Sequence, residues 1–323
     1  GDVGARIVGN NLASNGTLQL LKLDGNNICD PGATAIGEGI TANTSMQELW
    51  LDGNDIGDEG AASIGRGIGR ASSVLRKLWL SKNHIGDAGA VAIGDALGAN
   101  FSLTAVGLDD NLISDEGASA LGSGIARNQS LQQLWMSRNQ IERLGVMQLW
   151  SCLSTNQTLR DLRLDANGSF QGDTLRPLGQ SLAVNTALEE LWFCNNHVDD
   201  MGLKFIFDGI AKNSSLRRLF LGFNNFTVAG LLAIQNDIAE NYTLKEFGFT
   251  TREIGSLNRS EETSLQVIQS VLHRNRTEVW KLFQQDGSPG EWAMILSEIL
   301  SKETGFDLCF ALLRNRPEIV GWR

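Results

Sequence analysis

The sequence has little proline and no long apolar run. Only 4 prolines occur among 323 residues, against 36 glycines, and 42% of the residues are hydrophobic. That composition is typical of a folded protein and excludes a disordered or collagen-like chain. No stretch approaches the roughly 20 apolar residues that a bilayer requires, and no basic and then apolar signal opens the sequence. We therefore expect a soluble protein that is not inserted in a membrane.

Positive charge is also scarce. The formal net charge is -10, and the sequence pI is about 4.9. A protein that binds nucleic acid or an anionic membrane surface needs a basic patch to neutralise phosphates. The charge balance therefore argues against both classes of partner.

Cysteines are few and irregularly spaced, at positions 29, 152, 194 and 309. The spacing fits neither a metal knuckle nor a disulfide framework, which favours free thiols in an intracellular, cytoplasmic protein. Several Asn-x-Ser/Thr triplets would be glycosylation acceptors in a secreted protein, so organelle and secreted locations stay open. These triplets begin at Asn43, Asn128, Asn156, Asn213 and Asn241. Because they recur at one place in a repeat, we attribute them to its turn.

The repeat itself dominates the sequence. Its first half reads Leu18-x-x-Leu21-x-Leu23-x-x-Asn26-x-Ile28 and returns from Met46 and then from seven further starts, each 28 or 29 residues apart. The alternating leucines predict a short strand. The second half reads Gly32-Ala33-x-x-Ile36-x-x-x-Ile40-x-x-Asn43, and apolar residues four apart predict a helix.

Polar residues recur at fixed places in the repeat. Asp30 and its equivalents, Asp58, Asp87 and Asp115, precede the helical glycine by two residues, where a carboxylate accepts amide hydrogens of the first helical turn. An asparagine column should satisfy the turning backbone of its own and the next repeat. It consists of asparagines at 26, 54, 83, 111, 139, 167, 196 and 224.

Stacking such units buries one continuous core and predicts an α/β solenoid. Parallel strands line its concave face and helices cover its convex face, because helices are wider than strands. The motif resembles the ribonuclease-inhibitor-like class of leucine-rich repeats over residues 4–254. That class includes the inhibitor, the sensor halves of intracellular immune receptors and GTPase-activating proteins that act on Ran. The resemblance implies a horseshoe that binds other proteins by its concave surface or rim.

The two ends of the repeat region differ. Residues from Gly4 onwards match the helical half of a repeat with no preceding strand, so we expect an upstream segment to be missing. At the other end, we expect residues 1–254 to form the solenoid and residues 255–323 to form a C-terminal helical cap. Helices are predicted near 264–274, 291–301 and 305–314. Two similar tail segments, 271–280 and 311–320, leave a second binding site there as an alternative.

Candidate catalytic groups do not converge. The three histidines, His84, His197 and His273, lie far apart in the sequence, and no zinc or calcium spacing occurs. The glycine-rich segment 65–69 does not directly follow a strand, so it is a poor phosphate loop. Asp24, Asp52, Asp109 and Asp165 share one place after the strand, where we expect a solvated acidic face. The sequence therefore predicts no enzyme, no metal and no cofactor.

The position between the two inward leucines of each strand is the candidate binding site. It holds Lys22, Trp50, Trp79, Gly107, Trp135, Arg163, Trp192, Phe220 and Gly248. Alternation sends these side chains to the concave surface, where exposed aromatics and arginine favour partner binding over mere stacking on each other. The mixed polar rim beside them is expected to contain Glu48, Lys77, Gln133, Asp161, Glu190 and Arg218.

These features predict a protein-binding or scaffold module. We expect the partner to be a protein surface or peptide on the concave face, or a subunit of a larger complex. Two alternatives remain at this point: a GTPase activator similar to those acting on Ran, and a structural subunit of a large assembly. Since the tryptophans are expected to be exposed, replacing Trp79 and Trp135 by alanine should leave stability nearly unchanged.

Overall fold

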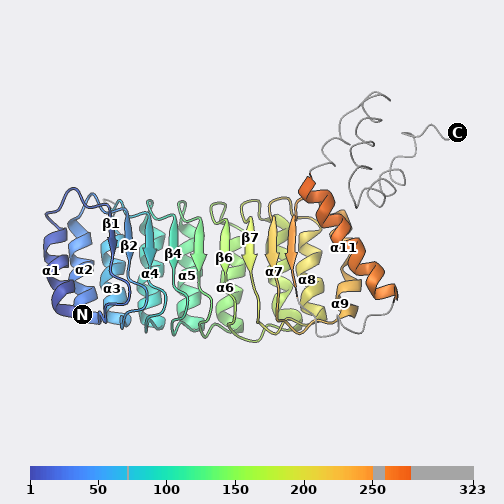
Figure 1. Cartoon of the computed structure of the whole chain (residues 1–323), viewed down its shortest axis with the longest axis horizontal. Coiled ribbons are helices and arrows are strands. Elements are labelled where there is room, and N and C mark those ends of the chain that lie inside the picture. Colours follow the sequence, from blue (N-terminus) through green and yellow to red (C-terminus); the bar gives the residue numbers. More distant parts are fainter. Residues whose placement is uncertain (71–72, 250–258, 278–323) are drawn as a thin grey trace, which may run out of the picture.

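A computed structural model describes residues 1–70, 73–249 and 259–277 of the chain. One open sheet of nine parallel strands runs through it, with the strands in the order of the sequence (Figure 1). The strands are β1 (Leu20–Lys22), β2 (Glu48–Trp50), β3 (Lys77–Trp79), β4 (Ala105–Gly107), β5 (Gln133–Trp135), β6 (Asp161–Arg163), β7 (Glu190–Trp192), β8 (Arg218–Phe220) and β9 (Glu246–Gly248). Each strand comes from one sequence repeat, which confirms the predicted strand, turn and helix unit.

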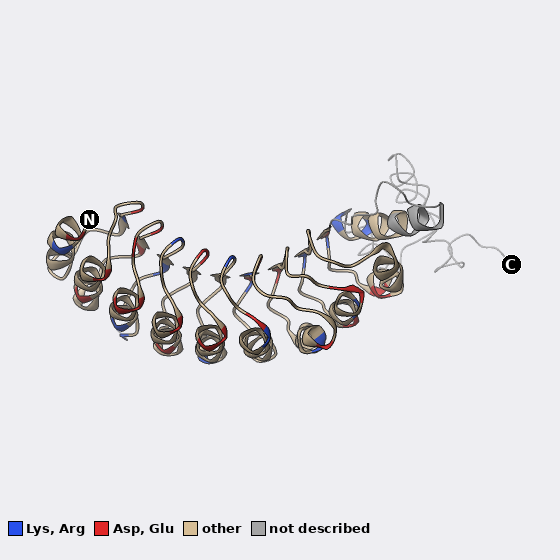
Figure 2. Ribbon diagram, turned by 90° about the horizontal axis from the view of Figure 1, so that it is seen from below, with Lys and Arg blue, Asp and Glu red and all other residues tan. Residues whose placement is uncertain are grey.

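Helices form a second layer along one face of the sheet. They are α1 (Asp2–Leu12), α2 (Asp30–Ala42), α3 (Asp58–Ile68), α4 (Asp87–Ala99), α5 (Asp115–Arg127), α6 (Arg143–Leu153), the short η1 (Gly172–Leu175), α7 (Arg176–Val184), α8 (Asp200–Ile210), α9 (Val228–Ala233), α10 (Gln235–Glu240) and α11 (Arg259–Thr277). Figure 2 shows the resulting arc, with the helices on the outer, convex side. The predicted solenoid with a concave sheet is confirmed.

The core lies between the two layers. The central residue of each strand pairs in register with its neighbours, as Leu49 does with Leu21 and Leu78. Leu49 and Leu78 are fully buried beneath the helical isoleucines, whereas Leu21 in the first strand is only partly covered. Stacking is thus what buries each repeat, as expected for a solenoid.

Glycines let neighbouring helices approach closely. A Cβ placed on Gly124 of α5 would lie 2.0 Å from the carbonyl oxygen of Gly94 in α4. On Gly209 of α8 it would lie 2.1 Å from the carbonyl oxygen of Gly179 in α7. Only a residue without a side chain fits such contacts. The glycines of the helical half therefore pack the convex layer, as the sequence indicated.

The asparagine column after the strands ties consecutive repeats together. The amide of Asn54 donates to Leu51 O and Leu23 O, and its oxygen accepts from the backbone NH of Ile28 at 3.0 Å. The structural role is confirmed, with one correction. Asn54 serves its own and the preceding repeat, not the next one, because the preceding turn lies beside its side chain.

The asparagines of the Asn-x-Ser/Thr triplets form a second buried ladder. Asn128 is 3% exposed, and its Nδ2 donates to Leu97 O at 2.7 Å and to Asn100 O at 2.9 Å. Its Oδ1 accepts from the backbone NH of Ser130 and Leu131. Nδ2 is the atom that glycosylation would modify, and here it is buried and bonded. The attribution of these triplets to turn chemistry is confirmed.

The aspartates at the helix starts do not cap their own helices as predicted. Asp30 Oδ1 accepts from the backbone NH of Gly57 at 2.7 Å and of Gly60 at 2.9 Å, both at the start of the next helix, α3. Asp58 bonds Gly86 and Gly89 at the start of α4 in the same way. In a parallel stack, the first turn of the next helix lies within reach of the carboxylate, so each of these aspartates caps the helix of the following repeat.

α11 packs over the end of the solenoid, against α9, α10 and β9. It spans residues 259–277, so it is longer than the helix expected near 264–274. Its Asn275 continues the second asparagine ladder, because its Nδ2 donates to Leu244 O at 2.7 Å and to Asn241 O at 3.1 Å. The predicted helices near 291–301 and 305–314 lie outside the described residues. The division of the chain at residue 254 remains a prediction.

Candidate functional site

The predicted binding column forms one line across the concave sheet. The strand register places Trp50 beside Trp79, and Arg163 between Trp135 and Trp192. Their rings touch in sequence: the centroids are 5.4 Å apart for Trp50 and Trp79, and 4.7 Å apart for Trp79 and Trp135. Within the line, the structure thus brings together aromatic residues that lie 29 positions apart in the sequence, as Trp50 and Trp79 do, or 56 positions apart, as Trp79 and Trp135 do.

Two cationic side chains belong to the line: Lys22 lies at its first end, and Arg163 lies within it. Lys22 Nζ lies 4.1 Å from the ring centroid of Trp50. The Arg163 guanidinium lies 4.1 Å from the ring of Trp135 and 5.1 Å from that of Trp192. Such contacts stabilise a cation by the ring quadrupole. Phe220 then stacks on Trp192 at 4.0 Å, so the contacts are continuous from Lys22 to Phe220.

Carboxylates accept the indole NH groups of three column tryptophans. Trp50 donates to Glu48 at 3.4 Å, Trp135 to Asp161 at 3.1 Å, and Trp192 to Glu190 at 2.5 Å. Trp79 differs, because its buried Nε1 has no hydrogen-bond partner in the described part of the chain. The other tryptophans bond either the residue two positions before them or the first residue of the next strand. For Trp79 these two residues are Lys77, which is itself a donor, and Ala105, which has no polar side chain.

Trp79 also corrects the expectation that the column is exposed. Its side chain is only 7% exposed, whereas Trp50, Trp135, Trp192 and Phe220 are half-buried. The reason is the neighbouring glycine: a Cβ on Gly107 would lie 2.5 Å from Cε3 of Trp79. The ring therefore lies over Gly107 between Trp50 and Trp135. The tryptophans of this column therefore do stack along the arc, which was the less favoured expectation from the sequence.

The polar rim is ion-paired. Lys77 contacts Glu48 at 2.9 Å, Arg163 contacts Asp161 at 3.1 Å, and Arg218 pairs with Glu190. Asp161 and Glu190 are buried, at 7% and 8% exposure, while Arg218 is exposed. The hydrogen bond from Lys77 lowers the pKa of Glu48 below its usual value. The acids thus hold the basic and aromatic side chains in place.

Three of the four aspartates after the strands are partly buried, contrary to the solvated face that was expected, whereas Asp24 is exposed. Asp52 Oδ1 accepts from the backbone NH of Ser81 at 2.6 Å, and Asp109 and Asp165 make the same bond to the next repeat. Burial raises the pKa of Asp52 to about 6, helped by Asp24 and Asp109 nearby. Burial also raises the pKa of Asp109 and of Asp165. These carboxylates link repeats and are partly removed from water.

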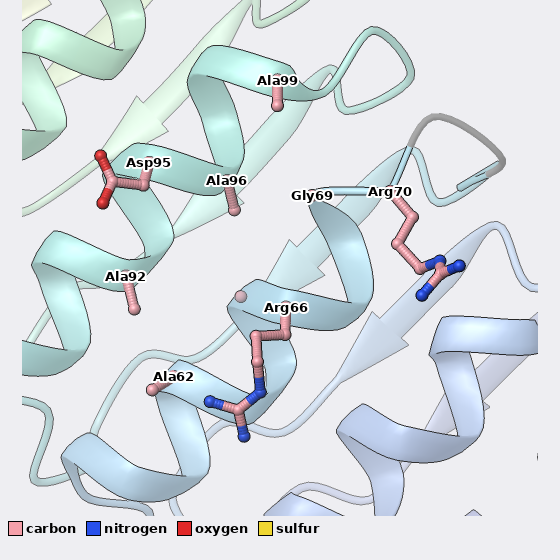
Figure 3. A pocket seen from close by; sticks show the side chains of 9 residues that line it. Ala62, Arg66, Gly69, Arg70, Ala92, Asp95, Ala96 and Ala99 are labelled. Carbon is pink, nitrogen blue, oxygen red and sulfur yellow. The ribbon is translucent and has the colours of Figure 1, made fainter.

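The glycine-rich segment 65–69 lies at the end of α3, on the convex side. Figure 3 shows the pocket that it borders, between α3 and α4. The volume is about 550 Å³, and the walls carry Arg66, Arg70 and Asp95 among alanines and glycines. The segment is helical and follows no strand, so the structure gives it a packing role.

Side chains that could act in catalysis or bind a metal do not cluster in the described part of the chain. His84 and His197 are exposed in the turns of different repeats. Among the described residues, no group of three His, Cys, Asp or Glu side chains could hold a metal ion. The cysteines at 29, 152 and 194 are free thiols, and burial raises the pKa of Cys152 to about 12. No helix within the described ranges is long and apolar enough to span a bilayer.

Comparison with known proteins agrees with the repeat and the sheet. A family model described as Leucine Rich repeat matches residues 14–37, 42–65, 71–94, 99–122 and 212–234. The chain is a leucine-rich-repeat protein.

Among solved structures, the leucine-rich-repeat fold of this chain is similar to that of internalin C2 from Listeria monocytogenes. The TM-score is 0.50 at 17% sequence identity, over 77% of this chain and 93% of that chain. At that identity, the likeness concerns the fold alone. None of the curated proteins compared with the chain matches it. The ribonuclease-inhibitor-like subclass stays a prediction.

Proposed function

We propose that this leucine-rich-repeat protein binds a protein partner on its concave face, without catalysis. The contact residues would be the aromatic and basic column together with its polar rim. They are Trp50, Trp79, Trp135, Arg163, Trp192, Phe220, Glu48, Lys77, Asp161, Glu190 and Arg218.

The observation that carries the proposal is the fixed position of Arg163 between two tryptophans. Its guanidinium is held by two rings and by Asp161, yet the side chain remains 30% exposed. Tryptophan and arginine are enriched among residues that dominate binding energy. Side chains that are already ordered lose less entropy on binding, so a rigid column favours affinity. Trp79 supports its neighbours more than it offers surface of its own.

Cross-linking identifies the face that a partner occupies. The chain is captured with partners from cells and treated with a lysine-reactive cross-linker, followed by mass spectrometry. Lys22 and Lys77 lie on the concave side, whereas Lys204 and Lys212 lie in and just after α8 on the convex side. We expect cross-links at Lys22 and Lys77. Cross-links confined to Lys204 and Lys212 would instead favour a structural subunit that binds by its convex helices.

Substitutions in the column provide the energetic test. Arg163→Ala or Trp192→Ala should each weaken binding of the captured partner at least about tenfold, because anchor residues at interfaces contribute about 2 kcal/mol or more. Leu144→Ala is the matched control, since Leu144 is a large, 69% exposed side chain in α6 on the convex face. Equal effects of all three substitutions would contradict a concave site.

A further inference from the structure

A second pocket lies where the strands of the first four repeats begin. Its volume is about 680 Å³, and its walls come from the turns that lead from the helices into β1, β2, β3 and β4. We call it the rim pocket, and the residues that line it include Gln47, Arg76 and Phe101. Gln47 and Arg76 directly precede Glu48 and Lys77 in the chain. The rim pocket therefore adjoins the polar rim of the concave face.

Arg76 has a fixed backbone and an unpaired side chain. Its backbone NH donates to Gln47 O at 2.7 Å, and its carbonyl oxygen accepts from the backbone NH of Thr104 at 2.8 Å and from Thr104 Oγ1 at 3.1 Å. The guanidinium is exposed and makes no ion pair or hydrogen bond with any described residue. Among the described residues that line the rim pocket, Arg76 alone is charged. The pocket thus offers a cation without a counter-charge.

Later repeats show what an arginine at this place binds. Arg160 and Arg217 also directly precede a strand, and both contact the carboxylate of Glu189, which precedes the strand between theirs. In the repeats on either side of Arg76, a glutamine and a threonine stand at this place. The chain therefore supplies the carboxylate in the later repeats but not in the rim pocket.

Phe101 adds an apolar wall to the pocket. Its side chain is 71% exposed. At the equivalent turn position, the other repeats have glycine or a residue with a polar group: Gly16, Thr44, Ser73, Gln129, Gln157, Thr186, Ser214 and Tyr242. A single exposed phenylalanine is ordinary on a protein surface, but this one lines the same pocket as the unpaired arginine. Aromatic residues and arginine are both enriched where proteins bind each other.

The polar groups beside Arg76 favour an anionic ligand. The side chains of Thr44 and Gln47 line the pocket and have no hydrogen-bond partner among the described residues. A guanidinium and an amide both donate to carboxylate oxygens, and arginine can do so with two parallel bonds. The net charge of the chain, -10, repels a highly acidic ligand at long range. The chemistry therefore fits a segment with few carboxylates next to an apolar side chain.

We propose that an acidic segment of the protein partner docks in the rim pocket, with a carboxylate on Arg76 and Gln47 and an apolar side chain on Phe101. The inference rests on the proposed function in one respect, because it assigns this segment to the partner that the concave column binds. A segment that leaves the column past Glu48 and Lys77 reaches the pocket directly.

The test begins with random twelve-residue peptides displayed on phage. They are selected in parallel against the immobilised full chain and its Arg76→Gln variant, and sequences enriched only on the wild type are synthesised for isothermal titration calorimetry. We expect peptides with aspartate or glutamate near an apolar residue. Arg76→Gln should weaken their binding at least about tenfold, because it removes a charged donor. Phe101→Ala should weaken it at least about fivefold, because it removes the apolar wall.

A double-mutant cycle tests for direct contact. Replacing the carboxylate of the peptide by an amide should weaken binding to the wild type at least about tenfold, but should change binding to Arg76→Gln by less than about twofold. The matched controls are Arg66→Gln and Leu144→Ala, which remove an exposed arginine of α3 and an exposed leucine of α6 on the convex side. Each control should change affinity by less than about twofold.

Three results would overturn the inference: no acidic sequence enriched only on the wild type, additive losses in the cycle, or equal weakening by Arg66→Gln and Arg76→Gln. Thermal melts verify that the variants are folded, and they should be nearly unchanged because Arg76 and Phe101 are exposed.

The outcome also distinguishes this inference from the proposed function. If Arg163→Ala and Trp192→Ala weaken binding of the captured partner while no peptide depends on Arg76, the concave column binds and the rim pocket does not. If peptides depend on Arg76 but cross-links to the captured partner fall only on the convex helices, the rim pocket binds an acidic segment and the proposed function is wrong.

Discussion

At the scale of single residues, Trp79 combines burial with an unsatisfied donor. Its ring contacts Trp50 and Trp135 and covers Gly107, while its Nε1 has no acceptor among the described residues. Burial of the ring stabilises the fold, but an unmade hydrogen bond of a buried donor costs about 1–3 kcal/mol. The two effects can be separated by substitution.

Trp79→Ala should therefore lower the free energy of unfolding by about 2–3 kcal/mol, somewhat less than the usual 3–5 for a buried tryptophan. Trp79→Phe keeps an aromatic ring and removes the unsatisfied NH, so it should lie within about 1 kcal/mol of the wild type. Equilibrium denaturation in urea measures both. If Trp79→Ala were as stable as the wild type, the ring would not be part of the packed structure, and the earlier expectation of an exposed column would stand.

Asp52 makes stability depend on pH in an unusual direction. Its pKa is raised from 3.8 to about 6 in the folded state, so the folded chain holds this proton more tightly than the unfolded chain. The stabilising contribution is complete below pH 3.8 and is lost as the pH rises to 6. Because the carboxylate is half-buried, we expect the loss to be about 1 kcal/mol.

Asp52→Asn should remove this dependence. The variant and the wild type should unfold at similar urea concentrations near pH 4, and the variant should be more stable at pH 7 by about 1 kcal/mol. Urea titrations at both values of pH measure the difference. A gap that is the same at pH 4 and pH 7 would show that ionisation of Asp52 does not oppose folding.

The concave column was predictable from the sequence in its position but not in its exposure. Strand alternation correctly placed Trp50, Trp79 and Trp135 on the same face. The burial of a column side chain depends on the residue beside it in the next repeat. Gly107, beside Trp79, was the signal in the sequence, because a ring can lie flat over a neighbouring glycine. Asp52, Asp109 and Asp165 differ from the expected solvated face for a similar reason, because their carboxylates bond the backbone of the next repeat.

At the scale of helices and strands, the spacing within one repeat determines where each helix and strand forms, whereas contacts with adjacent repeats determine how the helices are capped. Apolar spacing predicted every strand and the helical half of the repeat, because local periodicity is sufficient for that. Capping was assigned to the wrong helix, since Asp30 serves α3 and not α2. Sequence distance suggests the same helix, whereas in a stack the closest amide groups belong to the next one.

The effect of replacing a helical glycine by alanine on the free energy of unfolding depends on how closely the neighbouring helix approaches. Gly124→Ala would place a methyl group 2.0 Å from the carbonyl oxygen of Gly94, and backbone cannot yield as a side chain can. We expect a loss of about 2–3 kcal/mol in the free energy of unfolding. At Gly4 in α1 nothing lies within 4 Å, so Gly4→Ala should be neutral or stabilising by up to about 1 kcal/mol. Similar effects at both sites, measured by urea denaturation, would mean that the helices are not in close contact.

At the scale of the whole molecule, each repeat is stabilised by its contacts with the adjacent repeats. Inner strands pair with a strand on each side, and inner helices contact the helices of both neighbouring repeats. The last repeat has β8 on one side and α11 on the other, where Ile268 and Leu272 are buried. In such an array, the end repeats fray first unless something covers them.

Removing residues 255–323 should therefore uncover the apolar edge around Leu244 and Phe247, which are 0% and 6% exposed in the intact chain. It also removes the two hydrogen bonds from Asn275 to Asn241 O and Leu244 O. We expect aggregation, or faster hydrogen exchange that begins in residues 188–254 and declines towards the first repeats. Hydrogen exchange followed by mass spectrometry resolves the repeats separately. If residues 188–254 stayed as protected as in the intact chain, the C-terminal region would not be a cap, and the contacts of α11 would have another purpose.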